Sequence, residues 1–530
     1  MNNILQKLTL LLVIFAFTFS TNAQEIEIHI GNDAKAYKKE RIISAHHADD
    51  GVIILKTQFK LIGSSKYYLE IFDKKMNFVS RNELDFPDKD LNFSQMRYLN
   101  GKIYLFMQKY DKRNKVNTAY GTILSRNGSF DSDIFELVQF ETEKRNRVNS
   151  FDISISADST SFMIETTPPF IDKEQMASRH FLIIDQDFKE IDNIKIDFPF
   201  KERDFSINST HLDLQGNLHM LSSVAIEETR RNTIFRTSVE TEARVFTLYK
   251  GESDVQEYVI NFLNDDAGFI SQIRMKTDDL GRLQCAGFYS DSKGNSTRGI
   301  FVFTIDVKTR EISNVSSQEF TDEYLNQFLT DRQVRKKERK RSRDAKKNPY
   351  ERLYHYKVRD IVMKKGGGFY MVAEYYLHTI TTTTDSQGNT RTTHHYHFDD
   401  LMVISVLKDN TVDWYSRVPK KQYSTNDGGT YSGIVTGINK DNSLNIIFND
   451  NNDNASQILN ENIKNLNLKK SKVVLVKFEE DGNASKTPLF GDRKSKVHLI
   501  PAASPVGKQN DIILYSRGKN KNRFTNVILK

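Results

Sequence analysis

Short segments in which apolar and polar residues alternate recur along the whole chain. In each segment a turn-forming residue is followed by apolar residues two and four positions later, as at Gly51 with Ile53 and Leu55. Alternation with a period of two after a turn residue predicts a β-strand with one face in a core. The eight turn residues are Gly51, Gly101, Thr160, Gly216, Gly281, Gly367, Asn442 and Asn510. Successive turn residues are 50 to 86 residues apart, which indicates a repeated structural unit.

Each unit has room for four strands. In the third unit we expect them over residues 151–157, 161–166, 180–185 and 191–198. Four-stranded units repeated at this spacing resemble the blades of a β-propeller, which pack side by side around an axis. We therefore expect an all-β propeller of about eight blades, or seven if one of the turn residues is spurious. Tandem β-sandwiches are the alternative, because they also contain short strands at regular spacing.

The two ends of the chain fit a ring. The last unit, from about Lys496, supplies only three strands, and residues 25–30 alternate Glu or His with Ile without a unit of their own. We expect this N-terminal strand to complete the last blade, which removes an exposed sheet edge. Residues 24–530 then form a single propeller domain.

The sequence motifs of named propeller families are largely missing. The single Trp lies in Val412-Asp413-Trp414, so the Trp-Asp dipeptide of WD40 blades is absent. Double glycines of the kelch type occur only at residues 366–368 and 428–429. The resemblance is therefore architectural and assigns no functional residue, since a fold does not by itself imply a function.

Residues 1–23 have the pattern of a signal peptide. Lys7 precedes an apolar run over residues 8–19, and small residues stand at the −3 and −1 positions before Gln24. The run is shorter than the ~20 residues that a membrane-spanning helix needs. We expect an exported protein, in the periplasm, at the cell surface or outside the cell, with no transmembrane span in the mature chain.

Composition adds two constraints. The chain has 530 residues, 38% hydrophobic and 27% charged, which is typical of a folded globular protein. Its single cysteine, Cys285, cannot form an internal disulfide, so a hydrophobic core must stabilise the fold. Because Cys285 lies in an apolar stretch, we expect a buried, unreactive thiol.

Residues 321–348 interrupt the strand pattern and predict an inserted helix with Thr321 as its N-cap. Residues 331–347 carry ten Lys or Arg against three acidic residues, a net charge of +7 that equals the formal charge of the whole chain. The segment is either a solvated helix face or a docking element for an anionic surface. The residues predicted to dock are Arg335, Lys336, Lys337, Arg339, Lys340, Arg341 and Arg343. Export argues against a nucleic-acid partner.

Residues 375–398 predict an inserted β-hairpin with Thr-rich arms around residues 385–389. With a two-residue loop at the tip, His378, His395, His397 and Asp399 share one face. Imidazole and carboxylate together form a ligand set for a first-row metal ion, although no known zinc spacing matches and an exposed polar hairpin has the same composition. We predict no other cofactor.

No motif of an established catalytic site occurs in the sequence. We expect a non-catalytic binding or scaffold propeller of the cell envelope, with a protein, a glycan or an anionic envelope surface as its partner. The alternative is an extracellular hydrolase or lyase that acts on glycans at the propeller axis. That alternative requires carboxylates and a His or Tyr that converge near the axis.

Overall fold

The computed structural model describes residues 26–59, 65–142, 151–225, 241–260, 269–278, 280–290, 296–326, 335, 353–456, 463–491, 497–505 and 511–529. The predicted signal peptide lies outside these residues, and so does the predicted basic helix apart from its first turn and Arg335. Within the described ranges, no helix has both the length and the apolar character needed to cross a membrane.

The strands form eight antiparallel sheets of four or five strands, together with one small two-stranded sheet. The first sheet consists of β3 (Glu40–Ala48), β4 (Gly51–Gln58), β5 (Lys66–Asp73) and β6 (Phe78–Glu83), and the second of β7 (Asn92–Leu99), β8 (Lys102–Asp111), β9 (Val116–Leu124) and β10 (Phe135–Glu141). The third sheet consists of β11 (Phe151–Ile155), β12 (Ser161–Thr166), β13 (Met176–Asp185) and β14 (Glu190–Lys201), and the fourth of β15 (Phe205–Leu212), β16 (Leu218–Ala225), β17 (Thr241–Leu248) and β18 (Val255–Val259). The next three consist of β19 (Phe269–Thr277), β20 (Leu283–Ser290), β22 (Gly299–Asp306) and β23 (Glu311–Glu319); β25 (Tyr356–Met363), β26 (Phe369–Thr384), β27 (Thr390–Val406) and β28 (Val412–Val418), with β29 (Tyr423–Thr425) added to β27; and β30 (Val435–Ile438), β31 (Leu444–Asn451), β32 (Ser471–Phe478) and β33 (Ala484–Phe490). The eighth combines β34 (His498–Leu499), β35 (Asp511–Arg517) and β36 (Lys521–Leu529) with β1 (Ile26–Ile30) and β2 (Ala34–Lys35), and β21 (Ser296–Thr297) pairs with β24 (Leu353–Tyr354) in the small sheet.

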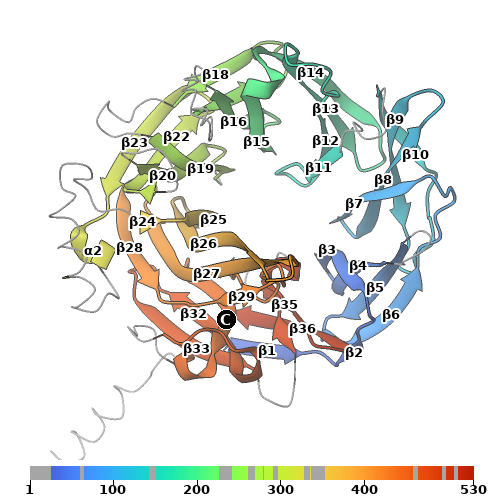
Figure 1. Ribbon diagram of the computed structural model, residues 1–530. Helices are drawn as coiled ribbons and strands as arrows, with labels where there is room; N and C mark the ends of the chain where they lie inside the picture. The colour runs from blue at the N-terminus through green and yellow to red at the C-terminus, as the bar shows by residue number, and fades with distance from the viewer. Residues whose placement is uncertain are drawn as a thin grey trace, which may run out of the picture.

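The sheets follow one another around a ring, with the first strand of each sheet near the centre and the fourth at the outside (Figure 1). This is the arrangement predicted from the repeat. Seven of the turn residues found in the sequence stand at, or just before, the start of the second strand of a sheet, and the eighth, Asn510, lies outside the described residues. The third sheet also has its four strands at the predicted places, with longer third and fourth strands.

The second strands are buried on both faces rather than on one, which corrects the sequence-based expectation. On β4, Ile53 and Leu55 pack with β8 residues, whereas Val52 and Ile54 pack with Ile513 and Tyr515 of the last sheet. Each sheet lies between two neighbours, so both of its faces become core. The apolar side chains of the eight sheets therefore form a continuous series of clusters between sheets.

The N-terminal strand completes the last sheet, as the sequence predicted. Ile28 of β1 pairs with Val527 of β36, and the register runs from Ile26 opposite Leu529 to Ile30 opposite Thr525. The first and last sheets also share a core in which the rings of Phe72 and Phe524 lie 4.7 Å apart. Strand pairing and side-chain packing thus join the two ends of the described chain.

The turns explain why the repeat was visible in the sequence. Gly216, Gly281 and Asn442 have φ angles of 84°, 76° and 65°, in the left-handed region that glycine and asparagine tolerate best. In each case the preceding Asp or Asn accepts a backbone hydrogen bond that closes the loop, as Asp213 does from Gly216 N at 3.1 Å. A left-handed residue at the end of a three-residue hairpin loop is a common way to reverse a strand.

The inserted helix begins where the sequence predicts. Helix α2 spans Asp322–Asn326, and the Thr321 hydroxyl accepts a hydrogen bond from Tyr324 N at 3.3 Å. Tyr324 and Leu325 are buried in the core between the fifth and sixth sheets. The short 3₁₀ turns η2 (Glu202–Asp204), η3 (Asn452–Asn454), η4 (Leu468–Lys470) and η5 (Pro501–Ala503) connect strands elsewhere.

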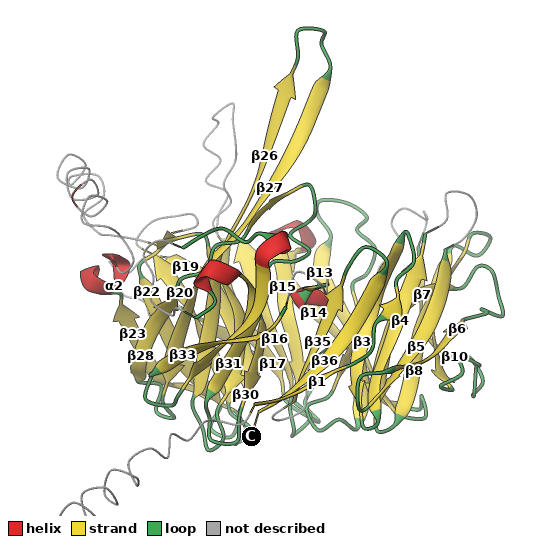
Figure 2. Ribbon diagram, turned by 90° about the horizontal axis from the view of Figure 1, so that it is seen from below, coloured by secondary structure: helices red, strands yellow, loops and turns green. Residues whose placement is uncertain are grey.

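The predicted hairpin is an extension of two blade strands rather than a separate insertion. β26 and β27 pair continuously from Phe369 opposite Val406 to Thr384 opposite Thr390, with one bulge between Glu374 and Tyr376. Their distal half projects well beyond one face of the ring (Figure 2). At the base of the projection β29 pairs with His395–His397 and widens it to three strands.

Candidate binding site

The innermost strands carry a β-bulge at an equivalent position in five of the eight sheets. The register shifts fall between Ile42 and Ser44, Phe93 and Gln95, Ile207 and Ser209, Ile270 and Gln272, and Val358 and Asp360. A bulge redirects the side chains beside it and is frequent next to binding sites.

At four of these five bulges the polar residue that follows contacts the innermost strand of the next sheet. The Gln272 amide donates to Tyr356 O, and its carbonyl oxygen accepts from Val358 N at 3.0 Å. Gln95 donates to Asp152 at 2.9 Å in the same way. The sequence repeats a short motif at these two bulges, Ser-Gln-Met-Arg at residues 94–97 and Ser-Gln-Ile-Arg at residues 271–274. This repeat could have identified the inter-sheet contact, although the alternation of apolar and polar residues does not reveal it.

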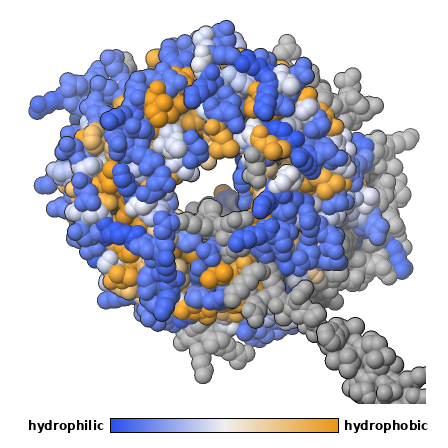
Figure 3. Space-filling model, turned by 180° about the vertical axis from the view of Figure 1, so that it is seen from behind, coloured by the Kyte–Doolittle hydropathy of each residue, from blue (hydrophilic) through white to orange (hydrophobic). Residues whose placement is uncertain are grey.

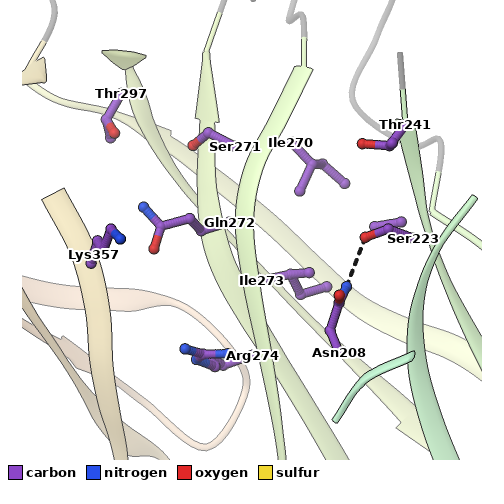
Figure 4. A pocket seen from close by; sticks show the side chains of 11 residues that line it. Asn208, Ser223, Thr241, Ile270, Ser271, Gln272, Ile273, Arg274, Thr297 and Lys357 are labelled. Carbon is purple, nitrogen blue, oxygen red and sulfur yellow. Dashed lines mark hydrogen bonds between the residues drawn. The ribbon is translucent and has the colours of Figure 1, made fainter. Parts of the chain in front are cut away.

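A cavity of about 470 Å³ lies between the innermost strands of the fourth, fifth and sixth sheets (Figure 4). It is lined by Asn208, Ser223, Thr241, Ala243, Ile270, Ser271, Gln272, Ile273, Arg274, Thr297 and Lys357. Two of these side chains are cationic, several are amides or hydroxyls, and none is a carboxylate, a histidine or a cysteine. From behind, the surface is mostly hydrophilic and opens at the middle of the ring (Figure 3).

The two cations of the cavity are free to meet a ligand. Arg274 and Lys357 are both exposed, and no hydrogen bond or ion pair engages Arg274 within the described part of the chain. Its counterpart in the repeat, Arg97, is instead turned onto Gln95 and the backbone oxygen of Ile153. Burial lowers the pKa of Arg97. The arginine of this repeated motif thus makes contacts within the protein in the second blade, whereas in the fifth blade it remains accessible to a ligand.

Lys357 also connects the cavity to the projecting hairpin. Its ammonium nitrogen lies 4.6 Å from the ring centroid of Tyr376, a cation–π contact. Beyond Tyr376, one face of the hairpin carries aromatic and imidazole rings in succession. Tyr376 packs against Phe398 with centroids 4.9 Å apart, and His378 stacks on Tyr396 at 4.6 Å. We call Tyr376, Phe398, His378, Tyr396 and His394 the ring ladder.

A buried ion cluster fixes the base of this ladder. Lys420 and Glu374 have fully buried side chains, and the Lys420 nitrogen lies 2.7 Å from the Glu374 carboxylate. Arg359 pairs with the same carboxylate at 2.7 Å, and its guanidinium lies 5.2 Å from the Tyr376 ring centroid. Lys420 also donates to Phe398 O at 2.6 Å. These contacts fix Tyr376 and Phe398 at the base of the ladder, where Lys357 lies over the Tyr376 ring.

The predicted metal-ligand set does not share one face, and this prediction was wrong in its register. His378 lies opposite Tyr396, so it shares a face with His394, whereas His395 and His397 lie on the other face. The tip is a three-residue loop closed by Asp385 and Asn389, not the two-residue loop we expected. A shift of one residue moves every side chain of a strand to the opposite face.

Parts of the predicted set remain close together. His397 Nδ1 lies 3.9 Å from the Asp399 carboxylate. Burial raises the pKa of Asp399, while Gln422 N donates to it. Within the described ranges, no three or more His, Cys, Asp or Glu side chains gather closely enough to hold a metal ion.

Of the predicted docking residues, the structure describes Arg335, which is helical and exposed. Lys336, Lys337, Arg339, Lys340, Arg341 and Arg343 lie outside the described residues. Cys285 is fully buried, and burial raises the pKa of its thiol, so it has the environment that the sequence indicated.

One pair of carboxylates lies on the inner strands of the third sheet. Asp152 and Glu165 are directly opposite each other on β11 and β12. Burial raises the pKa of Glu165, and the charge of Asp152 adds to the effect, although Thr210 donates to the Glu165 carboxylate at 2.9 Å. Gln95 binds the other member of the pair.

No protein-family model matches the sequence, and no curated protein matches it. Among solved structures, the chain is similar to the β-propeller domain of the Trilobed protease from Pyrococcus furiosus, with 11% identity over 74% of this chain and 96% of that one and a TM-score of 0.33. It is also similar to prolyl oligopeptidase B from Galerina marginata (9% identity, 90% and 55% covered, TM-score 0.37). A third likeness is to the complex of Drosophila Plexin A with Semaphorin 1b (10% identity, 95% and 88% covered, TM-score 0.32).

The protein is a β-propeller of eight antiparallel four-stranded blades, the last of which incorporates the N-terminal strand. This assignment rests on the strand pairing. Likenesses as distant as those above carry no information about a ligand or a reaction, so only this chain's own residues bear on its function.

Proposed function

We propose that this propeller is an exported, non-catalytic binding protein of the cell envelope and that its ligand is an acidic glycan. The observation that carries the proposal is the position of Lys357, which lines the cavity and also makes a cation–π contact with Tyr376, the first ring of the ladder. One cation is thus placed where a charged group and an apolar ring face of the same ligand would meet.

The chemistry of the surface suits such a ligand in three ways. Arg274 and Lys357 can pair with carboxylate or sulfate groups, and Arg can do so with two parallel hydrogen bonds. Asn208, Ser223 and Gln272 offer amide and hydroxyl groups to sugar hydroxyls. The rings of the ladder provide flat apolar faces on which the C–H faces of pyranose rings can pack.

The lining of the cavity argues against chemistry at this place. General acid–base catalysis most often uses an imidazole or a carboxyl group within hydrogen-bond reach of the reacting atoms. The described lining residues supply cations, amides, hydroxyls and aliphatic groups only. Such a set orients a ligand and satisfies its polar groups, which is what a binding site needs.

Calorimetric titration of the chain from Gln24 onward with oligosaccharides of matched length tests the proposal. We expect polyuronate oligomers to bind and neutral oligomers to bind much more weakly, with affinity falling as salt is added. Arg274→Gln and Lys357→Gln should each weaken binding at least about tenfold, since a hydrogen bond to a charged group contributes roughly 1.5–3 kcal/mol. Lys189→Gln, an exposed lysine at a distant turn, is the control.

Equal binding of acidic and neutral oligomers would reject the ligand class. Release of shorter products during the incubation, followed by chromatography, would reject the non-catalytic role instead. The two parts of the proposal therefore fail separately.

The basic segment over residues 331–347 provides a mode of attachment in this proposal. Its net charge of +7 suits an anionic surface such as lipid headgroups. Replacing Arg335, Lys336, Lys337, Arg339, Lys340, Arg341 and Arg343 with Gln should abolish binding to anionic vesicles at low salt. Unchanged vesicle binding would show that the segment is only a solvated surface.

A glycan hydrolase or lyase is the second candidate, and the Asp152–Glu165 pair is the observation that favours it. A carboxyl group with a raised pKa opposite a second carboxyl group is the kind of arrangement that glycosidases use. If this candidate is correct, Asp152→Asn and Glu165→Gln abolish product release, while Arg274→Gln reduces it less. Unaltered product release in both carboxylate variants would exclude the pair.

A further inference from the structure

The strand register brings together two imidazoles of the ring ladder, those of His378 and His394. His378 lies opposite Tyr396, and His394 lies opposite Ile380, so the two histidines are diagonal neighbours on one face of the hairpin. The Nε2 atom of His378 is 3.1 Å from the Nδ1 atom of His394. Their rings are nearly parallel, with an angle of 10° between the planes and centroids 5.3 Å apart.

This separation is that of a hydrogen bond between the two imidazoles, and it is also compatible with two nitrogen ligands of one metal ion. Imidazole nitrogens bind first-row ions at about 2.0–2.1 Å, so two of them lie about 2.9 Å apart at a right angle and about 3.3 Å apart at the tetrahedral angle. The observed 3.1 Å lies between these values. We propose that His378 and His394 form a two-histidine site for a divalent transition-metal ion, with water completing its coordination.

Neighbouring groups orient the His378 ring and fix the backbone of His394. Tyr396 stacks on His378 with an angle of 4° between the ring planes. The backbone of His394 is fixed by Asn426, whose Oδ1 accepts from His394 N at 2.9 Å and whose own N–H donates to His394 O at 3.0 Å. Ligands that are oriented by packing and by neighbouring hydrogen bonds bind metal ions more tightly than free side chains do.

The chemistry of the pair selects the ion. Neutral imidazoles suit copper, nickel and zinc, whereas calcium and magnesium require oxygen ligands. No described carboxylate contributes to the pair, and its surface position leaves room for water. The usual order of affinities then predicts that Cu²⁺ binds most tightly.

The opposite face of the hairpin offers a matched control. His395 has the same sequence neighbourhood, but its Nδ1 lies 2.8 Å from the Tyr423 hydroxyl and its Nε2 lies 2.8 Å from Thr381 Oγ1. Both of its nitrogens are therefore engaged. Replacing His395 should leave the metal site intact if the observed register is correct.

Titration of the chain from Gln24 onward, produced without a polyhistidine tag, with CuCl₂ tests the proposal. We expect one Cu²⁺ equivalent whose paramagnetic resonance spectrum shows coupling to two nitrogens. His378→Asn and His394→Asn should each weaken this binding at least tenfold and remove one nitrogen from the spectrum. His395→Asn should retain both the affinity and the spectrum.

Retention of the site in His378→Asn or in His394→Asn would overturn the proposal, and so would its loss in His395→Asn. Circular dichroism of each variant checks folding, and the exposed position of the pair makes misfolding a small risk. The inference rests on the register of β26 and β27 and does not depend on the glycan ligand. Titration of glycan in the presence of a chelator separates the two.

Discussion

The ammonium nitrogen of Lys357 lies 4.6 Å from the ring centroid of Tyr376, so one cation belongs to both the cavity wall and the base of the hairpin. This contact predicts that the two side chains act together on an acidic glycan. In a double-mutant cycle with Lys357→Gln and Tyr376→Leu, we expect the two losses of binding free energy to be non-additive by about 0.5–1 kcal/mol. Calorimetry of the wild type, both single variants and the double variant measures the coupling. Additive losses would show that the contact has no role in binding.

The buried pair of Lys420 and Glu374 should be costly to break from one side. Lys420→Met leaves the Glu374 carboxylate without its buried partner, and we expect a loss of about 3–5 kcal/mol in the free energy of unfolding. Adding Glu374→Leu removes the buried carboxylate, for which Arg359 would be the one remaining cation described, and should recover part of this loss. Denaturant unfolding of the two variants checks the prediction, which fails if the double variant is no more stable than the single one.

Strand β1 should stabilise the closure of the last sheet. A chain that begins at Gly31 lacks the pairing of Ile26–Ile30 with β36 and leaves the edge of that strand open. We expect a lower melting temperature and a tendency to aggregate, compared with a chain that begins at Glu25. Calorimetry and light scattering measure both effects, and equal behaviour of the two chains would show that β1 is dispensable.

Two inner-strand histidines should make stability depend on pH. Burial lowers the pKa of His46 and of His211 to about 4, from 6.5. The unfolded chain therefore binds more protons below about pH 6.5, and stability falls as the pH drops from there towards 4. At pH 5 the loss should reach up to about 2 kcal/mol for each histidine.

Melting temperatures at pH 7 and pH 5 measure this loss. The double variant His46→Gln, His211→Gln should lose less stability between these pH values than the wild type does. An equal loss in both proteins would assign the pH dependence to other groups.

Cys285 should be unreactive until the protein unfolds. Its side chain is fully buried between sheets, and burial raises the pKa of the thiol, which suppresses the reactive thiolate. We expect no reaction with an aromatic disulfide reagent in the native protein at pH 8, and one equivalent in guanidinium chloride. Reaction of the native protein within minutes would indicate that the core around β20 opens readily.

The propeller and its closure could be predicted from the sequence because their signals are local. Gly216, Gly281 and Asn442 mark the turns since a left-handed backbone suits few other residues, and the apolar residues after them follow the period of a strand. The alternating segment at residues 26–30 predicted a strand without a sheet of its own, and the last unit had only three strands, so the two were expected to pair. The N-cap at Thr321 could also be predicted, because the signal for the start of a helix is local in the sequence.

The binding surface could not be predicted in this way, because it is assembled from blades that are far apart in the sequence. Only the ring brings Asn208, Arg274 and Lys357 around one cavity, and only packing leaves Arg274 open while Arg97 turns onto the next blade. The loop between Asp385 and Asn389 has three residues rather than two, and this difference of one residue decides which side chains share a face of the hairpin. As a result, His378 lies beside His394. Local sequence thus determined where the strands and turns occur, whereas the tertiary structure determined which side chains meet, since strand pairing and packing act between distant segments.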